Sequence, residues 1–290
     1  MEPPFTDDEA VAAFPDYGVV SPRLGLGAYK IAYRGQRDQS DLVVKIIKEP
    51  VVGSEDELTD LPERFARELL AMELVKCPHV VTLVERPSLR LVGLSQHLWY
   101  VEPFYSGPTL RDVIKSGDHG PALAEKVLLQ MLKAVKAMWE SPSRIVHRDI
   151  KPGNIIFDSN KDLVLLDLGI AFHSDLTDVT DSFMTSPMTA LYAAPEQFIM
   201  RRFATIDFRT DLYQIGIVAF EAATGRHPFW HTGITSAEYQ RRMAAFDADQ
   251  LDGFGLSRPF VGVVTRLLAE RPAGRFRSVD QVLSILGGNT

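Results

Sequence analysis

The stretch His147-Arg148-Asp149-Ile150-Lys151-Pro152-Gly153-Asn154 decides how the rest of the chain is interpreted. Within eight residues it holds an acidic group, a cation and an amide, at Asp149, Lys151 and Asn154. The apolar segments Ile155–Phe157 and Leu163–Leu166, separated by a polar turn, predict a β-hairpin that ends at Asp167. Carboxylate and amide oxygens at the base of this hairpin suit Mg²⁺, which takes oxygen ligands and keeps phosphate oxygens in its shell.

This motif, followed by Asp167-Leu168-Gly169, resembles the catalytic loop and the metal-binding triplet of the protein kinases. The resemblance implies that Asp149 accepts or orients a substrate hydroxyl and that Lys151 steadies the γ-phosphate. It also implies that Asn154 and Asp167 hold Mg²⁺, with Mn²⁺ as an alternative. Each residue alone is an ordinary polar loop residue. The combination of these residue types at these spacings argues against a chance match.

Composition sets the class of protein that can surround this motif. The chain has 290 residues, 46% hydrophobic and 24% charged, which is enough for one large globular domain or two lobes. A net charge of −7 argues against nucleic acid or an anionic membrane as a partner. The single cysteine, Cys77, excludes an internal disulfide, and the acidic first residues do not resemble a signal peptide. We therefore expect a cytoplasmic protein.

The expected fold is α+β and bilobal, protein-kinase-like, with a small antiparallel sheet and one main helix in the first lobe and a larger, mostly helical second lobe. We place an N-terminal leader at residues 1–18, the nucleotide-binding lobe at 19–102 and the catalytic lobe at 103–290. Within the leader, Asp7-Asp8-Glu9 predicts a short helix through Phe14 that packs on the first lobe.

A glycine-containing strand turn comes first in the nucleotide-binding lobe. Gly25 and Gly27 would let backbone amides approach phosphate oxygens, because neither carries a Cβ atom. The kinase pattern has a third glycine where this chain has Lys30, and a valine where it has Ala32. Val43 stands where kinases carry alanine, so the summed volume of the two side chains that cover adenine is unchanged.

Lys45 lies within the apolar run 41–48, where a lysine seldom stays buried without an anionic partner. It resembles the kinase lysine that holds the α- and β-phosphates. The family pairs this lysine with a glutamate of the main helix, which a capping box at Asp60 predicts to follow. Family spacing selects Glu68, although Glu63 and Glu73 lie on the same helix.

We expect strands at residues 80–84 and 98–101, with turns near Pro87 and Gly93. The segment after them joins the lobes, and the resemblance places its residues in the nucleotide site. Glu102 takes the gatekeeper position, Pro103 supplies a carbonyl and Tyr105 supplies the amide for adenine. The resemblance adds Ile156 to this nucleotide site.

The remaining family features lie in the second lobe. An apolar i/i+4 stripe predicts a helix over 122–140. Met188 to Glu196 resembles the segment that ends in Ala-Pro-Glu in kinases, and Thr189 resembles the threonine that bridges base and lysine in serine/threonine kinases. Arg275 resembles the arginine that pairs with Glu196. Asp211 is either a helix N-cap or the family aspartate that holds the catalytic-loop backbone.

Three functions remain open on this basis. The first is a serine/threonine protein kinase that transfers the γ-phosphoryl group of ATP to Ser or Thr hydroxyls of a protein substrate. It would also phosphorylate its own loop between Asp167 and Glu196, where the candidate sites are Thr177, Thr180, Ser182, Thr185 and Ser186. The second is a kinase-fold pseudoenzyme, a nucleotide-binding scaffold without turnover, supported by the departures at Lys30, Met188 and the Ala32/Val43 exchange. The third is a small-molecule kinase, against which the Ala-Pro-Glu segment and Arg275 argue.

Overall fold

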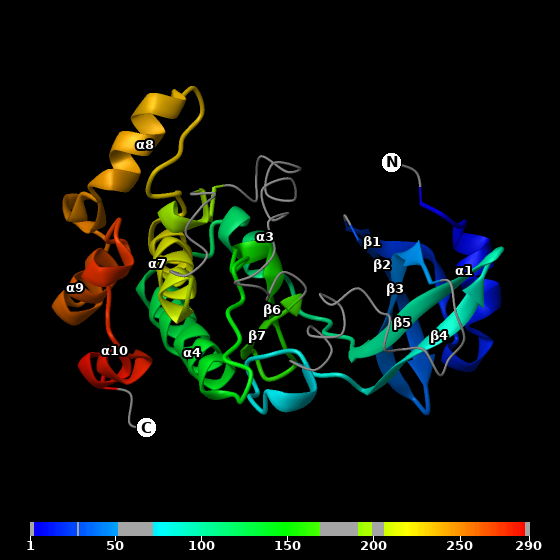
Figure 1. Ribbon diagram of the computed structural model, residues 1–290. Helices are drawn as coiled ribbons and strands as arrows, with labels where there is room; N and C mark the ends of the chain where they lie inside the picture. Colours follow the sequence, from blue (N-terminus) through cyan, green and yellow to red (C-terminus); the bar gives the residue numbers. More distant parts are fainter. Residues whose placement is uncertain (1–2, 28, 52–71, 169–190, 199–205, 288–290) are drawn as a thin grey trace. The chain divides into compact units, whose positions relative to one another are not determined.

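The computed structural model describes residues 3–27, 29–51, 72–168, 191–198 and 206–287. The chain forms two compact units (Figure 1). The first comprises Met1–Glu73 and Val81–Tyr105, and the second comprises Leu74–Val80 and Ser106–Thr290. An antiparallel sheet dominates the first unit and helices dominate the second, so the predicted α+β class is confirmed.

The sheet of the first unit has five strands in the spatial order β1-β2-β3-β5-β4, all paired antiparallel. Their bounds are β1 Val20–Leu26, β2 Lys30–Arg37, β3 Ser40–Pro50, β4 Glu85–Val92 and β5 Ser95–Pro103. In the centre of the sheet, Lys45 lies opposite Ala32 on β2 and opposite Tyr100 on β5, while Val43 lies opposite Glu102. Because side chains alternate along a strand, these five residues share one face.

The prediction of a strand at 80–84 is wrong. Val80 belongs to the second unit, where it forms an isolated bridge with Leu165, and the strand of the first-unit sheet is β4, which contains Pro87. A proline has no N–H for the ladder and is tolerated on an edge strand or at an irregularity. β4 is one of the two edge strands, and its register shifts between Glu85 and Ser88. The turn at Gly93 is confirmed, with a φ of 61° that suits glycine.

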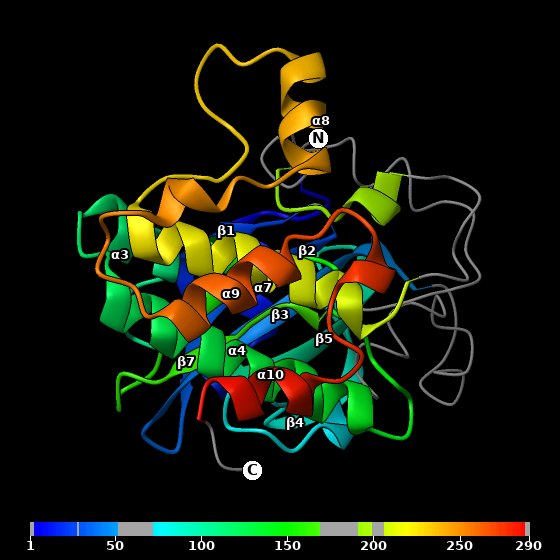
Figure 2. The same ribbon diagram turned by 90° about the vertical axis from the view of Figure 1, so that its left-hand side faces the viewer.

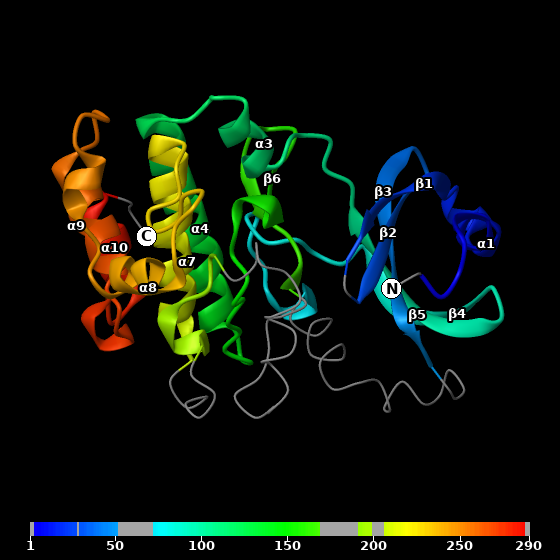
Figure 3. The ribbon, with the colours of Figure 1, turned by 90° about the horizontal axis from the view of Figure 1, so that it is seen from above.

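The predicted N-terminal helix is confirmed as α1, Asp7–Ala13, and it begins with a capping box at Thr6. The segment from this helix to Tyr17 lies against the sheet (Figure 3) and contributes Phe14 and Tyr17 to the buried core. Both rings meet Trp99 edge to face, with centroids 5.0 Å apart. The N-terminal segment therefore covers the face of the sheet opposite to Lys45.

In the second unit, α4 and α7 are the two longest described helices and pack side by side. The elements of this unit are α3 Leu110–Lys115, α4 Pro121–Glu140, β6 Ile155–Phe157, β7 Leu163–Leu165, α7 Phe208–Thr224, α8 Ser236–Ala244, α9 Arg258–Leu267 and α10 Val279–Ile285. Figure 2 shows α9 on α7 and α10 on α4. The predicted helix over 122–140 and the predicted hairpin are confirmed by α4 and by β6 with β7.

Candidate active site

In the first unit, the polar centre is an ion pair between two adjacent strands. The Lys45 ammonium lies 2.8 Å from the Glu102 carboxylate, and the two side chains are only 9% and 3% exposed. The strand register explains the contact, because both side chains point to the same face from neighbouring strands. The expected partner Glu68 lies outside the described residues, so the structure adds a Lys45 partner that the sequence had not indicated.

Lys30 lies on this same face of the sheet. Its ammonium donates a hydrogen bond of 3.0 Å to the Tyr100 hydroxyl and stands 5.7 Å from the centre of that ring. Lys30 lies opposite Ile47 on β3, two positions along the strand from Lys45, so two lysine side chains share the face. The position that lacks the third glycine therefore adds a cation to the face that carries Lys45.

The other predicted nucleotide residues are distributed over both units. Gly25 and Gly27 are exposed at the end of β1, where the Gly27 N–H bonds to the Lys30 carbonyl at 2.9 Å. Ala32 and Val43 are half-buried on the Lys45 face. Pro103 ends β5, and Tyr105 follows it in the first unit. Ile156 belongs to the second unit, where it lies in β6.

In the second unit, Asp149 is the centre of a compact polar cluster. The Lys151 ammonium donates to both carboxylate oxygens of Asp149, at 2.9 and 2.7 Å. The Asn154 amide nitrogen lies 2.9 Å from the Asp149 carboxylate and 2.9 Å from its carbonyl. Asp149 and Asn154 are buried and the Lys151 side chain is 16% exposed. The structure thus brings together the three residues that the motif singled out.

Asp167 is placed beside this cluster by the hairpin. The Leu166 N–H donates to the Asn154 carbonyl at 2.8 Å, next to the paired residues Ile155 and Leu165. Asp167 itself has a φ of 56°, in the left-handed region that non-glycine residues seldom adopt. Such backbone strain is held only by surrounding structure and concentrates at functional sites.

His147 has a structural position rather than one that suggests acid–base chemistry. Its ring is fully buried, with Nε2 3.0 Å from the Leu166 carbonyl and Nδ1 accepting from the Asp149 N–H at 3.2 Å. Burial lowers the pKa of His147, so the neutral ring is favoured. The histidine therefore ties the catalytic loop to the end of the hairpin.

The two predicted roles of Asp211 are resolved by the structure. The N-cap of α7 is Asp207, whose side chain accepts from the Arg209 N–H. Asp211 instead accepts from the His147 and Arg148 N–H groups, each at 2.8 Å. Burial raises the pKa of Asp211 to about 7, against the two N–H bonds and the charge of Arg148. Asp211 thus anchors the catalytic loop to α7.

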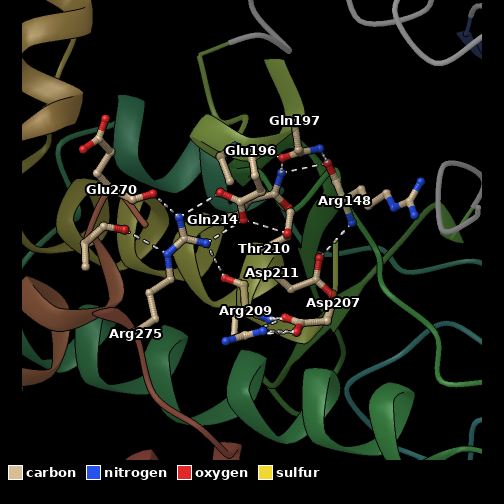
Figure 4. Close-up of polar contacts among 12 residues, drawn as sticks. Arg148, Glu196, Gln197, Asp207, Arg209, Thr210, Asp211, Gln214, Glu270 and Arg275 are labelled. Carbon is tan, nitrogen blue, oxygen red and sulfur yellow. Dashed lines mark hydrogen bonds and ion pairs between the residues drawn. The ribbon is translucent and has the colours of Figure 1, made fainter. Parts of the chain in front are cut away.

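The expected pairing of Arg275 with Glu196 is confirmed. Two parallel contacts of 2.7 and 2.9 Å join the guanidinium to the carboxylate, and both side chains are buried (Figure 4). The Thr210 hydroxyl donates a further bond of 2.8 Å to Glu196. Close to this pair, Gln197 and Gln214 both donate to the Arg148 carbonyl. The sequence had not indicated these two residues, since a glutamine in a helix or turn has no distinctive chemistry.

Two predicted catalytic residues, Glu68 and Thr189, lie outside the described residues, as do the candidate phosphorylation sites of the loop before Thr189. The part of the chain that the structure describes holds no helix with both the length and the apolar character to cross a bilayer.

The geometry of the catalytic loop and hairpin agrees with the similarity of this chain to known proteins. A family model, the protein kinase domain, matches residues 19–284. The chain belongs to this family. The first-unit sheet and the helical second unit are thus the two lobes of a protein kinase fold.

Curated relatives within this family include bacterial serine/threonine-protein kinases. The probable kinase PknB of Bifidobacterium longum is 31% identical over 225 residues, which cover 75% of this chain and 32% of that protein. PknB of Mycobacterium leprae is 28% identical over 221 residues, 76% of this chain and 34% of that protein. The chain therefore spans about a third of the length of these relatives.

A solved structure supports the fold. The crystal structure of Rad53 1-466 in complex with AMP-PNP superposes with a TM-score of 0.70 at 22% sequence identity. The match covers 95% of this chain and 66% of that chain. At this identity the similarity shows the fold alone.

Proposed function

We propose that this chain is a serine/threonine protein kinase, which transfers the γ-phosphoryl group of ATP to Ser or Thr hydroxyls of a protein. The observation that carries the proposal is the bonded cluster of Asp149, Lys151 and Asn154, with contacts of 2.7 to 2.9 Å. Phosphoryl transfer asks a protein mainly for positioning and charge neutralisation. A carboxylate held by a cation and an amide meets that demand.

Asp149 would orient the attacking hydroxyl and accept its proton, and Lys151 would stabilise the transferring phosphoryl group. In the first unit, Lys45 would bind the α- and β-phosphates, with the backbone at Gly25 and Gly27. Ala32, Val43, Glu102, Pro103, Tyr105 and Ile156 remain the proposed residues for adenine. Glu68 and Thr189 keep their proposed catalytic roles.

Asn154 and Asp167 fit a divalent cation by the chemistry of their donor atoms. The Asn154 amide nitrogen is directed at Asp149, which leaves the amide oxygen as the ligand atom. Together with the Asp167 carboxylate it offers the oxygen ligands that Mg²⁺ prefers and that Mn²⁺ also accepts. When bound, the cation would neutralise charge on the phosphates of ATP.

A groove in the second unit supports a protein substrate. It has a volume of about 990 Å³ and is lined by Leu191, Pro195 and Phe198 of the Ala-Pro-Glu segment and by residues of α8 such as Tyr239 and Met243. Phe198 and Trp230, which both line this groove, are 48% and 42% exposed, so the groove presents apolar surface to solvent. An apolar groove beside the Ala-Pro-Glu segment suits the side chains of a protein substrate.

The proposal is tested by incubating the purified chain with labelled ATP, Mg²⁺ and a general protein substrate. We expect label on serine and threonine with the wild type, and at least about a hundredfold less with Asp149→Asn or Asp167→Asn. The control variant is Asp158→Asn, which makes the same chemical change in the turn of the hairpin and should retain activity. ATP binding by a wild type that transfers no label would establish the pseudoenzyme instead.

The cytoplasmic location expected from the sequence stays a prediction, as does autophosphorylation of the loop. Mass spectrometry of the purified wild type and of Asp149→Asn tests the latter. Phosphate on loop residues of the wild type alone is the expected result.

A further inference from the structure

The backbone of the catalytic loop is held by side chains from outside the loop. Asp211 accepts hydrogen bonds from the N–H groups of His147 and Arg148. Gln214, one turn further along α7, binds two more backbone groups of this loop, one on each side of Asp149. Its amide nitrogen donates to the Arg148 carbonyl at 2.7 Å, and its amide oxygen accepts from the Ile150 N–H at 2.9 Å.

These two contacts bracket Asp149. The Arg148 carbonyl belongs to the peptide group before Asp149, and the Ile150 N–H belongs to the peptide group after it. A single amide that binds both groups limits rotation about the φ and ψ angles of Asp149. Because the direction of the Cα–Cβ bond follows from the backbone, Gln214 also limits where the Asp149 carboxylate can point.

The bracket is buried and its orientation is determined. Gln214 is 1% exposed, so water does not compete for its hydrogen bonds. If the amide were turned over, its oxygen would face the Arg148 carbonyl and its nitrogen would face the Ile150 N–H. Arg148 has a φ of 66°, and a left-handed arginine persists only where surrounding contacts hold it.

A second glutamine extends the contact to the Ala-Pro-Glu segment. The Gln197 amide nitrogen donates to the Arg148 carbonyl at 3.0 Å, so this carbonyl accepts from both glutamines. The Gln197 amide oxygen accepts from Gln214 at 3.1 Å and from the Ala194 N–H at 2.8 Å (Figure 4). The two amides therefore connect the backbone around Asp149 to Ala194 through hydrogen bonds alone.

We propose that Gln214 is a positioning residue for Asp149, and that Gln197 couples this position to the Ala-Pro-Glu segment. The proposal rests on the proposed kinase function for its catalytic consequence. Its chemistry requires a neutral amide, which donates to a carbonyl and accepts from an N–H at the same time. A methionine of similar size does neither, and a glutamate keeps the acceptor but loses the donor.

The test compares Gln214→Met and Gln197→Met with the wild type and with Gln130→Met. Gln130 is the matched control: it also bridges polar groups, accepting from the Leu163 N–H at 2.8 Å and donating to Asp162 at 2.6 Å, but away from the catalytic loop. We expect Gln214→Met to lower kcat about tenfold to a hundredfold while KM for ATP stays within about twofold. Gln130→Met should change neither constant, although it lowers the midpoint of thermal unfolding.

Gln197→Met should lower kcat by about threefold, because Gln214 still holds the Arg148 carbonyl. In the double variant the two effects should combine to less than their product, since the glutamines share an acceptor and bond to each other. Multiplicative effects would overturn the coupling. An unchanged kcat in Gln214→Met would overturn the positioning role, whatever that variant does to stability.

Amide hydrogen exchange gives a readout that does not depend on activity. The Ile150 amide should exchange at least about tenfold faster in Gln214→Met than in the wild type, while the amides of α4 exchange as before. Equal protection of Ile150 in both proteins overturns the bracket. Should Gln214→Met not fold, Gln214→Glu decides: it keeps the acceptor for Ile150 but loses the donor to Arg148, so kcat must still fall. A wild type without kinase activity would refute the proposed function, and the exchange result would still decide the bracket.

Discussion

A buried ion pair joins Arg275 to Glu196 in the second unit, and another joins Lys45 to Glu102 in the first unit. All four side chains are at most 9% exposed, so burial does not distinguish the pairs. The cations do. A guanidinium is a rigid planar fork with five N–H donors, whereas an ammonium is a compact charge on a flexible stem.

All five donors of Arg275 are used. Nε donates to the Ala269 carbonyl at 2.9 Å, Nη1 to Glu196 and the Arg209 carbonyl, and Nη2 to Glu196 and the Glu270 carbonyl. Moving the guanidinium toward any new anion would break several of these bonds together. The pair with Glu196 is therefore fixed, and it holds the Ala-Pro-Glu segment against α7 and the segment after α9.

Lys45 lies instead on the sheet face that carries the proposed nucleotide residues. Its ammonium can turn about the side-chain stem to meet another anion, and the phosphates of ATP carry charge of the same sign as Glu102. The comparison separates a structural ion pair from an exchangeable one. Loss of the first pair should therefore lower stability, and loss of the second should change ATP affinity.

The largest expected effect is on the fixed pair. Arg275→Met should lower the free energy of unfolding by about 3–5 kcal/mol, because it leaves the Glu196 carboxylate buried without its cation. Urea titration followed by circular dichroism measures the loss. Arg271→Met, at an exposed arginine four residues earlier, is the control and should change stability by less than about 0.5 kcal/mol. A loss below about 1 kcal/mol in Arg275→Met would show that the pair is not a structural lock.

The pairing of Arg275 with Glu196 could be predicted from the sequence, and so could the catalytic-loop cluster. The pairing of Lys45 with Glu102 could not. The chemistry of Asp149, Lys151 and Asn154 lies within six residues, so their contacts follow from a local motif. The α4 helix also followed from local periodicity. Glu196 and Arg275 are distant in sequence, but each stands in a recognisable family segment.

Contacts that depend on tertiary register had no such signal. Lys45 and Glu102 meet because β3 and β5 pair in one register, and a shift of one residue would turn Glu102 to the opposite face. Gln214 and Arg148 are 66 positions apart in the sequence. A neutral amide has no charge and belongs to no motif, so the sequence did not indicate this contact. Strand β4 was misplaced because Pro87 predicts a turn, whereas an edge strand tolerates it.

We expect an effect of intermediate size, on ATP binding, when the exchangeable pair of Lys45 and Glu102 is broken. Glu102→Gln removes the charge that competes with the phosphates for Lys45 and should lower KM for ATP by about threefold to tenfold, or about 1 kcal/mol. ATP with Mg²⁺ should raise the unfolding midpoint more in this variant than in the wild type. In Arg275→Met the ATP-induced shift should equal that of the wild type.

Glu85→Gln is the matched control for Glu102→Gln. Glu85 also carries a carboxylate that pairs with a cation in the same sheet, the guanidinium of Arg37, but it lies at the start of edge strand β4. KM for ATP should not change in this control. A KM that rises in Glu102→Gln would mean that Glu102 holds Lys45 in its working position and does not compete with the phosphates.

The smallest expected effect concerns Lys30, the second lysine on the sheet face. Its bond to Tyr100 places a cation two positions along from Lys45, and ATP carries enough charge to use both. Lys30→Gln should raise KM for ATP by about twofold to threefold, roughly 0.5 kcal/mol, with a weaker effect at high salt because the side chain is partly exposed to the screening ions. Lys48→Gln removes a lysine from the alternate position of β3 and should leave KM unchanged. Equal changes in the two variants would show that the gain is general attraction of ATP to a basic surface, and that the face carrying Lys45 acts through Lys45 alone.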